Sequence, residues 1–201
     1  MIVLSERRDA ELDAVLRAAL NGDEHAFRIV FRDLNPRLIH YLRALVGADA
    51  EDVAAEAWSS IARDHRSFRG DYDKFRGWAS AIARNRAIDF LRHRRRRSEV
   101  PAPVEDMIAL AGHDREAQEA LDRVVTGDAV EMITALPRPM AEAVLLRVAM
   151  GMDSKQAGRV LGKSPGAVRT AAYRGLRELA ERLKAESDTA EAERPSVKEK
   201  R

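Results

Sequence analysis

Apolar residues return at helical spacing along almost the entire chain, and this periodicity limits the fold more than any other feature. In residues 12–20, 38–46 and 53–61 an apolar side chain recurs every three or four positions, which gathers these side chains on one face of a helix. Stretches that alternate polar and apolar residues are hard to find, and aromatic residues make up only 5% of the chain, which disfavours β-strands. The sequence therefore predicts an all-α fold.

Turn and capping residues divide this pattern into successive helices. The Asn-Gly pair at 21–22 ends the first helix, and Asp23 has a side chain that can cap the second. The Asn-Pro pair at 35–36 is expected to break the second helix, because proline lacks the N–H that an interior helical residue donates. Asp49 is expected to cap a further helix, and residues 72–97 are predicted to form one long helix.

The same pattern predicts two small helical domains joined by a flexible linker. Residues 1–22 form an amino-terminal helical extension, and residues 23–97 complete the first domain. Residues 98–113 contain two prolines and no sustained apolar period, so they are interpreted as the linker. The second domain is expected over residues 114–184, and residues 185–201, with their alternating charges, as a disordered tail.

The most specific local signal is a predicted helix-turn-helix near the carboxyl end. A short helix over 153–161 is followed by a Gly-Lys turn and then by Ser164 and Pro165, a good N-cap and a good first helical residue. This geometry can place the second helix in a DNA major groove, although an ordinary helical hairpin with a solvated basic face has the same pattern. The apolar residues expected to face inward from the second helix are Val168, Ala172, Leu176, Leu179 and Leu183.

Charge is segregated along the chain, although the net charge is only +2. Seven arginines lie between positions 84 and 97, whereas residues 98–145 carry ten acids and three arginines. This separation indicates a protein that meets nucleic acid with part of its surface only. The run of four arginines at 94–97 is best interpreted as a nonspecific basic patch.

Several kinds of site are not expected. The chain has no cysteine, which excludes disulfides, thiol catalysis and the usual structural zinc sites. The five histidines share no metal-ligand spacing, and no catalytic constellation is recognisable, so neither an enzyme nor a metal or cofactor site is predicted. A signal-peptide core and a membrane-spanning run are also lacking, so a cytoplasmic protein is expected.

Three motifs resemble one family. The first, at residues 49–58, reads DAEDVAAEAW. The second, within residues 75–92, contains FRGW, IARN and DFLR. The third, within residues 136–169, contains LP, VLLR and SPGAVR. In this order and spacing they resemble the extracytoplasmic-function sigma factors, which are bacterial RNA polymerase specificity subunits. The resemblance reaches over about residues 23–183 and implies that sigma domain 2 precedes sigma domain 4.

The resemblance also implies roles for individual residues. Binding to core RNA polymerase is expected from the acids Asp49, Glu51, Asp52 and Glu56. Recognition and melting of the minus-ten element are expected from Phe68, Arg69, Tyr72, Arg84, Asn85, Asp89 and Arg92. Recognition of the minus-thirty-five element is expected from Lys155, Lys163, Ser164, Arg169, Thr170, Tyr173, Arg174 and Arg177. The implied partners are core RNA polymerase, promoter DNA as duplex and as non-template single strand, and the anti-sigma factor that this family commonly has.

Two other classes of protein stay open from the sequence. A dimeric helix-turn-helix regulator would use its amino-terminal helices for ligand binding or dimerisation, and by itself would bind a repeated half-site. A helical RNA-binding protein would use the arginine run but would leave the helix-turn-helix unexplained. The promoter sequence, the inducing signal and the roles of the two chain ends cannot be inferred.

Overall fold

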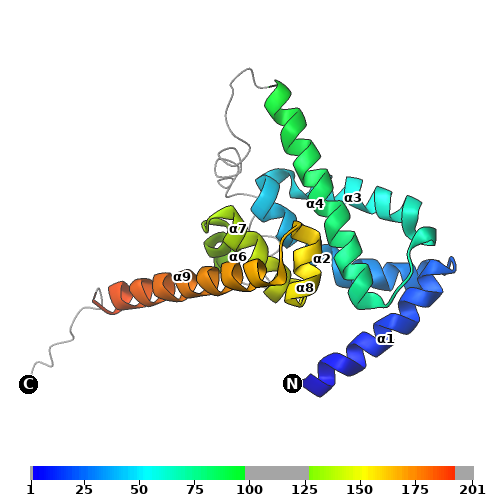
Figure 1. Cartoon of the computed structure of the whole chain (residues 1–201), viewed down its shortest axis with the longest axis horizontal. Coiled ribbons are helices and arrows are strands. Elements are labelled where there is room, and N and C mark those ends of the chain that lie inside the picture. Colours follow the sequence, from blue (N-terminus) through cyan, green and yellow to red (C-terminus); the bar gives the residue numbers. More distant parts are fainter. Residues whose placement is uncertain (1, 98–126, 193–201) are drawn as a thin grey trace, which may run out of the picture.

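The computed structural model describes residues 2–97 and 127–192, and helices make up nearly all of this part (Figure 1). The first domain contains α1 (Ile2–Leu20), α2 (Glu24–Val46), α3 (Ala50–Asp64) and α4 (Tyr72–Arg97), with short 3-10 turns η1 (Gly47–Asp49) and η2 (His65–Ser67). The second contains α6 (Gly127–Thr134), α7 (Arg138–Val144), a π-helical turn η3 (Leu145–Ala149), α8 (Ser154–Leu161) and α9 (Pro165–Ala192). No β-strand occurs within these two ranges, which confirms the all-α prediction.

The predicted helix boundaries hold where local chemistry sets them. Gly22, with a φ of 99°, follows the end of α1, and the Asp23 carboxylate accepts a hydrogen bond from the Ala26 N–H at 3.0 Å at the start of α2. That hydrogen bond lowers the pKa of Asp23. Asp49 precedes α3 but its side chain does not cap the helix; it lies 3.2 Å from a guanidinium nitrogen of Arg94 instead. The prediction of a cap at Asp49 was therefore wrong.

The predicted break at 35–36 is also wrong, because α2 passes through Pro36 without ending. Leu34 and Leu38, on either side, are completely buried, so an unbroken helix keeps both in the core. The Asn35 side chain accepts a hydrogen bond from the Trp58 indole N–H at 2.9 Å, which ties this point of α2 to α3. Packing thus outweighs the local cost of proline.

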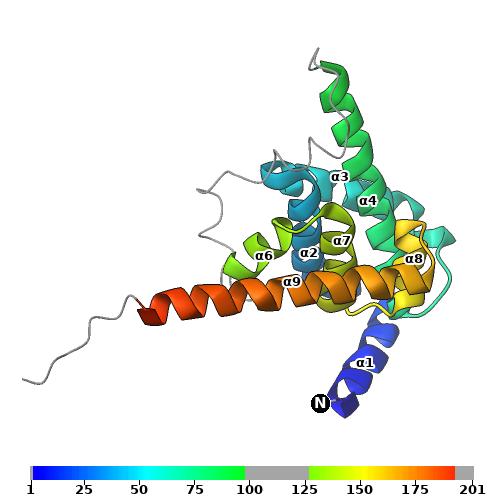
Figure 2. The same cartoon turned by 60° about the vertical axis from the view of Figure 1, so that its left-hand side comes forward.

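Helix α2 is the central element of the fold. It contacts α1, α3 and α4 in the first domain, and also α6, α7 and η3 in the second (Figure 2). One continuous apolar core therefore contains residues of both domains, from Leu16 and Leu42 to Leu146 and Val168. The two predicted domains are packed on one another in this structure, which their sequences do not indicate.

Helix α9 presents a different face to the core than its leucines suggest. Val168, Ala172 and Leu179 are buried as predicted, whereas Leu176 and Leu183 are 46% and 51% exposed. The residue that faces α7 is Gly175: a Cβ atom there would lie 2.8 Å from Val144 Cγ2. A glycine at this point lets α7 and α9 approach closely, and this close approach turns Leu176 outward.

Of the predicted linker and the predicted tail, only the first part of the tail lies within the described residues. Helix α9 continues past Lys184 to Ala192, so the first part of the predicted tail is helical. The sequence there is rich in alanine and glutamate, which are strong helix formers. The predicted linker at 98–113 and residues 193–201 lie outside the described residues.

Candidate polymerase and nucleic-acid interfaces

Helix α3 carries three of the four predicted polymerase-binding acids on its outer face. Its inner residues Val53, Ala57 and Ile61 are buried, so Glu51, Asp52 and Glu56 point to solvent. Glu51 lies 3.6 Å from Arg43, whereas the carboxylates of Asp52 and Glu56 have no ion pair or hydrogen bond with the described residues. Two unpaired carboxylates four residues apart form a rigid acidic stripe that can meet a basic partner.

The middle of α4 carries the predicted minus-ten residues on two sides of the helix. Asn85 is exposed, and Asp89 is exposed and lies 3.4 Å from Arg92. Arg84 points instead toward the second domain, where its Nε lies 3.1 Å from Glu142 Oε1. Asn85, Asp89 and Arg92 are therefore brought together on an accessible ridge, and Arg84 is separated from them.

The junction before α4 is built from aromatic side chains that are mostly buried. Phe68 is 8% exposed, and its ring centroid lies 5.3 Å from those of both Phe75 and Trp78. Tyr72 is 1% exposed. Arg69 is exposed and donates to two carbonyl groups of its own loop. Of the three predicted minus-ten residues at this junction, only Arg69 is accessible in this arrangement.

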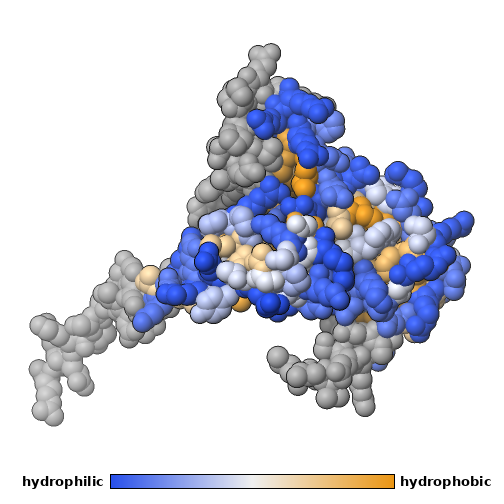
Figure 3. Space-filling view, viewed as in Figure 1, coloured by the Kyte–Doolittle hydropathy of each residue, from blue (hydrophilic) through white to orange (hydrophobic). Residues whose placement is uncertain are grey.

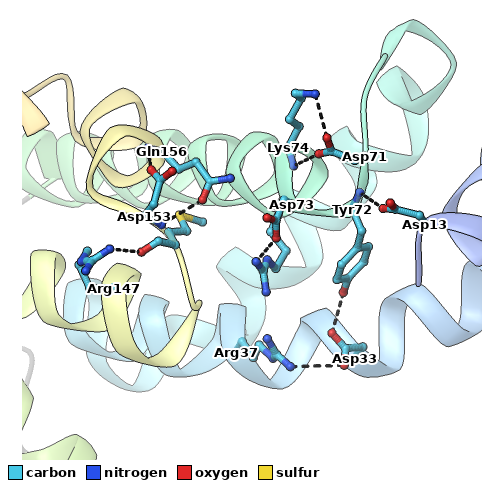
Figure 4. Close-up of polar contacts among 12 residues, drawn as sticks. Asp13, Asp33, Arg37, Asp71, Tyr72, Asp73, Lys74, Arg147, Asp153 and Gln156 are labelled. Atoms are coloured by element: carbon cyan, nitrogen blue, oxygen red, sulfur yellow. Dashed lines mark hydrogen bonds and ion pairs between the residues drawn. The ribbon is translucent and has the colours of Figure 1, made fainter. Parts of the chain in front are cut away.

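Tyr72, Asp33 and Arg37 form a polar cluster beneath this junction (Figure 4). The Tyr72 hydroxyl donates to Asp33 Oδ2 at 2.6 Å, and Arg37 lies 3.4 Å from the other oxygen of that carboxylate. Burial and the neighbouring Asp33 carboxylate raise the pKa of Tyr72. The tyrosine is thus a neutral hydrogen-bond donor that locks α4 to α2.

The helix-turn-helix consists of α8 and α9 with sharply defined ends. Asp153 caps α8 in a reciprocal pair with Gln156, and the hydrogen bond from the Gln156 N–H lowers the pKa of Asp153. Gly162 follows α8 in a left-handed conformation, with φ 64° and ψ 33°. Ser164 Oγ accepts a hydrogen bond from the Ala167 N–H at 3.2 Å and caps α9, as predicted.

The predicted minus-thirty-five residues are exposed on the first half of α9, on the turn before it and, for Lys155, on α8. Tyr173 is the most exposed large apolar side chain of the described residues, at 68%, and Arg177 is held by Glu181 at 2.9 Å. In Figure 3 the surface over α9 combines blue, hydrophilic residues with white and light-orange ones. All eight predicted residues are exposed: Lys155, Lys163, Ser164, Arg169, Thr170, Tyr173, Arg174 and Arg177.

A buried ion cluster joins the two domains. The Glu142 side chain of α7 is 4% exposed and meets Arg84 of α4 at 3.1 Å and Arg138 at 3.5 Å. Tyr41 of α2 is completely buried beside them, and burial together with the Glu142 carboxylate raises its pKa well above the ordinary value. No sequence signal pairs Arg84 with Glu142, because the two residues are far apart in the chain and each belongs to a different motif.

A second contact between the domains runs along α4 and α8. Between them lies a cleft of about 420 Å³, whose lining includes Lys74 and Trp78 of α4 and Arg159 and Val160 of α8. The Arg76 guanidinium reaches across to Gly151, which precedes α8. The helix-turn-helix therefore rests on the beginning of the arginine-rich helix.

Among residues 2–97 and 127–192, no group of three histidine or acidic side chains is arranged to hold a metal ion. None of its helices combines the length and the apolar character needed to cross a membrane.

Comparison with known proteins gives concordant results for both domains. Residues 30–97 match the family Sigma-70 region 2, and residues 127–179 match Sigma-70, region 4. The chain is 32% identical to the ECF RNA polymerase sigma factor SigD of Mycobacterium tuberculosis, over 89% of this chain and 87% of that protein. It is 31% identical to the ECF RNA polymerase sigma factor SigF of Caulobacter vibrioides, over 88% and 96% of the two chains.

Two solved structures share the fold. CnrH in complex with the cytosolic domain of CnrY superposes with a TM-score of 0.58 at 23% identity, over 87% of this chain and 98% of that one. The sigma factor RpoE of Bartonella quintana, in complex with the anti-sigma factor NepR, superposes with a TM-score of 0.59 at 20% identity, over 79% and 96%. Because residues 30–97 match Sigma-70 region 2, this part of the chain is a sigma region rather than the ligand-binding or dimerisation domain of a helix-turn-helix regulator. With both regions matched in order and curated relatives that align over most of their length, the chain belongs to the extracytoplasmic-function sigma factors of the sigma-70 family.

Proposed function

We propose that this protein binds core RNA polymerase in the cytoplasm and directs it to promoters by reading a minus-thirty-five and a minus-ten element. The observation that carries the proposal is that one sigma-type chain exposes two different reading surfaces, one on α9 and one on α4. Polymerase performs the chemistry, so the protein contributes binding free energy and needs no cofactor or catalytic group of its own.

Core binding is assigned to the acidic stripe of α3. Asp52 and Glu56 have no partner among the described residues, so a basic surface can meet both carboxylates without breaking an internal ion pair. Glu51 must share its charge with Arg43, and Asp49 with Arg94. Asp52 and Glu56 are therefore expected to contribute most.

The minus-thirty-five element is assigned to the exposed face of α9 and the turn before it. Arg169, Thr170, Tyr173 and Arg174 lie in the amino-terminal half of the helix, the part that enters the major groove in helix-turn-helix proteins. Arginine can bind guanine through two hydrogen bonds there, whereas Lys155 and Lys163 are placed to contact phosphates. These contacts need duplex DNA.

The minus-ten element is assigned to the ridge of Asn85, Asp89 and Arg92 and to the junction before α4. Amide and carboxylate side chains can pair with the edges of unpaired bases, and arginine can contact the phosphates beside them. Because Phe68 and Tyr72 are buried, we assign them to shaping the junction, and Arg69 to meeting the strand. These contacts need an opened strand.

The two elements can be read together only when the domains separate. A spacing of about 25 base pairs places them about 85 Å apart along the duplex. In this structure Arg84 of the minus-ten helix touches Glu142 of the second domain. The solved relatives were crystallised with CnrY and with the anti-sigma factor NepR, which supports an anti-sigma factor as a further partner of this chain.

The test is a holoenzyme assay on a promoter selected from a random library by the wild-type protein. The promoter is used as intact duplex and with a pre-melted minus-ten bubble. Arg169→Ala and Arg174→Ala should lose dependence on the upstream element with both templates, by about 1 to 3 kcal/mol for each lost base contact. Asn85→Ala should be partly rescued by the bubble. Equal defects on both templates, with the same salt dependence, would mean that the basic surfaces make only nonspecific phosphate contacts.

A further inference from the structure

The first residue of α4 is held by side chains from two other helices. The backbone N–H of Tyr72 donates to Asp13 Oδ1 of α1 at 2.6 Å, and its hydroxyl donates to Asp33 of α2 (Figure 4). Asp13 and Tyr72 are far apart in the chain, so this hydrogen bond fastens the amino-terminal extension to the start of the arginine-rich helix.

The position of Asp13 suits the needs of a helix end. The first N–H groups of a helix have no partner inside it, and a carboxylate beside them also interacts favourably with the helix dipole. At the start of α4, Asp71 accepts from the Lys74 N–H at 2.8 Å, and Asp13 accepts from the Tyr72 N–H. One cap is thus local, and the other comes from α1.

The loop that ends at this cap is compact. Arg69 donates to the carbonyls of Arg66 and Phe68, and Gly70 is so tightly packed that a Cβ atom there would lie 3.0 Å from the Lys74 side chain. At one end Phe68 is buried against α4, and at the other the Tyr72 hydroxyl is bonded to α2. The hydrogen bond from the Tyr72 N–H to Asp13 adds an anchor from α1 to this second end.

We propose that Asp13 is a positioning residue for minus-ten recognition. By capping α4 from α1, it holds the loop at residues 68–71 at a fixed place relative to Asn85, so that the surface for an unpaired base is formed before DNA arrives. A preformed site binds more tightly because less ordering is needed on binding. The inference rests on the proposed function, and it gives a role to α1, which precedes the matched sigma region at 30–97.

Removing the Asp13 carboxylate should leave α1 in place. Leu12, Leu16 and Ala19 of α1 are buried against the domain, and α1 packs extensively along α2. Asp13→Ala therefore removes the cap without removing the helix. Asp13→Asn keeps an oxygen that can accept from the Tyr72 N–H, and Glu11→Ala removes an exposed acid of α1 that has no partner in the described residues.

The experiment uses full-length holoenzyme and a library of fork-junction DNAs whose single-stranded non-template minus-ten segment is randomised. Sequencing of bound DNA gives the preference for each base at each position. Asp13→Ala should lower the strongest preference about fivefold, the size expected for one lost cap of about 1 kcal/mol. Asp13→Asn should restore most of it, and Glu11→Ala should match the wild type. Hydrogen exchange of the free chain should become faster at residues 68–74 in Asp13→Ala.

Three outcomes would overturn the proposal. They are an unchanged base preference in Asp13→Ala, a uniform loss of binding to every library member and to core polymerase, and a failure of Asp13→Asn to recover. Asn85→Ala in the same assay distinguishes a failure of the role proposed for Asp13 from a failure of the proposed minus-ten surface. If it changes the preference and Asp13→Ala does not, only the role of Asp13 is refuted; if Asn85→Ala leaves the preference unchanged, the assignment of the minus-ten surface is refuted.

Discussion

Arg84 and Glu142 form an ion pair across the two domains, with 3.1 Å between Nε and Oε1, and the glutamate side chain is only 4% exposed. Arg138 approaches the same carboxylate oxygen at 3.5 Å, so two guanidinium groups meet one buried acid. The pair links α4 of the first domain to α7 of the second domain. Separating the domains must therefore break it.

Glu142→Ala should loosen the contact between the domains. Breaking a fully buried ion pair costs about 3 to 5 kcal/mol, and a smaller loss is expected here because the two arginines left without their shared carboxylate are 19% and 17% exposed. We expect a lower urea midpoint and a larger radius of gyration by small-angle X-ray scattering. Glu131→Ala removes an exposed acid of α6 and should change neither quantity. A Glu142→Ala protein as compact and stable as the wild type would show that this pair does not hold the domains together.

The double substitution Asp52→Lys with Glu56→Lys should weaken binding to core RNA polymerase about tenfold or more, which corresponds to about 1.4 kcal/mol. Both side chains are exposed and have no partner among the described residues, so reversing their charge should leave the thermal unfolding of the domain nearly unchanged. Asp64→Lys, at the end of the same helix, serves as the control for a charge reversal outside the acidic stripe. The affinity for core RNA polymerase is measured by fluorescence anisotropy. A double variant that binds core polymerase as tightly as the wild type would show that α3 is not part of the interface.

Gly175→Ala should destabilise the second domain by about 1 to 3 kcal/mol, the usual cost of overpacking a core. The added Cβ would lie 2.8 Å from Val144 Cγ2 and 3.2 Å from Met140 Cβ. Gly77→Ala in α4 is the matched control, because its Cβ would meet nothing within 4 Å, and it should stabilise by about 0.5 to 1 kcal/mol. Differential scanning calorimetry measures the change in stability of both variants. Equal effects of the two substitutions would contradict the close approach of α7 and α9.

Stability should fall as the pH drops below about 6.5, in part through His40. Burial, with a smaller effect of Arg43, lowers the pKa of His40 from its ordinary value of 6.5. A depressed pKa means that the unfolded chain binds a proton more readily than the folded one. The contribution of His40 to the free energy of unfolding is therefore complete above about pH 6.5 and is lost as the pH falls from there to the lower pKa of the folded protein. His40→Gln should flatten this part of the pH profile of urea unfolding. Parallel profiles for wild type and His40→Gln would refute the assignment.

The parts of the fold that sequence predicts are those governed by neighbouring residues. The cap at Asp23, the restart at Ser164 and the two helices of the helix-turn-helix each depend on side chains within three or four positions, and they lie where they were expected. Exposure on a helix face is equally local, which is why the acids of α3 and the basic residues of α9 are accessible as predicted.

The features that sequence did not predict depend on contacts between distant segments. Pro36 stays inside α2 because the packing of the residues on both sides outweighs the local cost of proline in a helix. Gly175, and not Leu176, faces α7 because the two helices come too close there for a side chain to fit between them. Phe68 and Tyr72 were expected to contact the minus-ten element, but both side chains are buried. Asp13 shows no local sign of its role, since its partner is the backbone of a residue far along the chain.

The length of α9 has a mechanical consequence. Its 28 residues rise about 1.5 Å each, so the helix is about 42 Å long, and it projects well beyond the packed helices (Figures 1 and 2). The residues assigned to base reading lie near its fixed end, and Ala192 lies at its free end. As a rigid lever of this length, α9 would convert a rotation of about 10° at the DNA into a displacement of about 7 Å at its tip. A fluorophore placed near that tip would report small changes in the orientation of the recognition surface as large changes in distance.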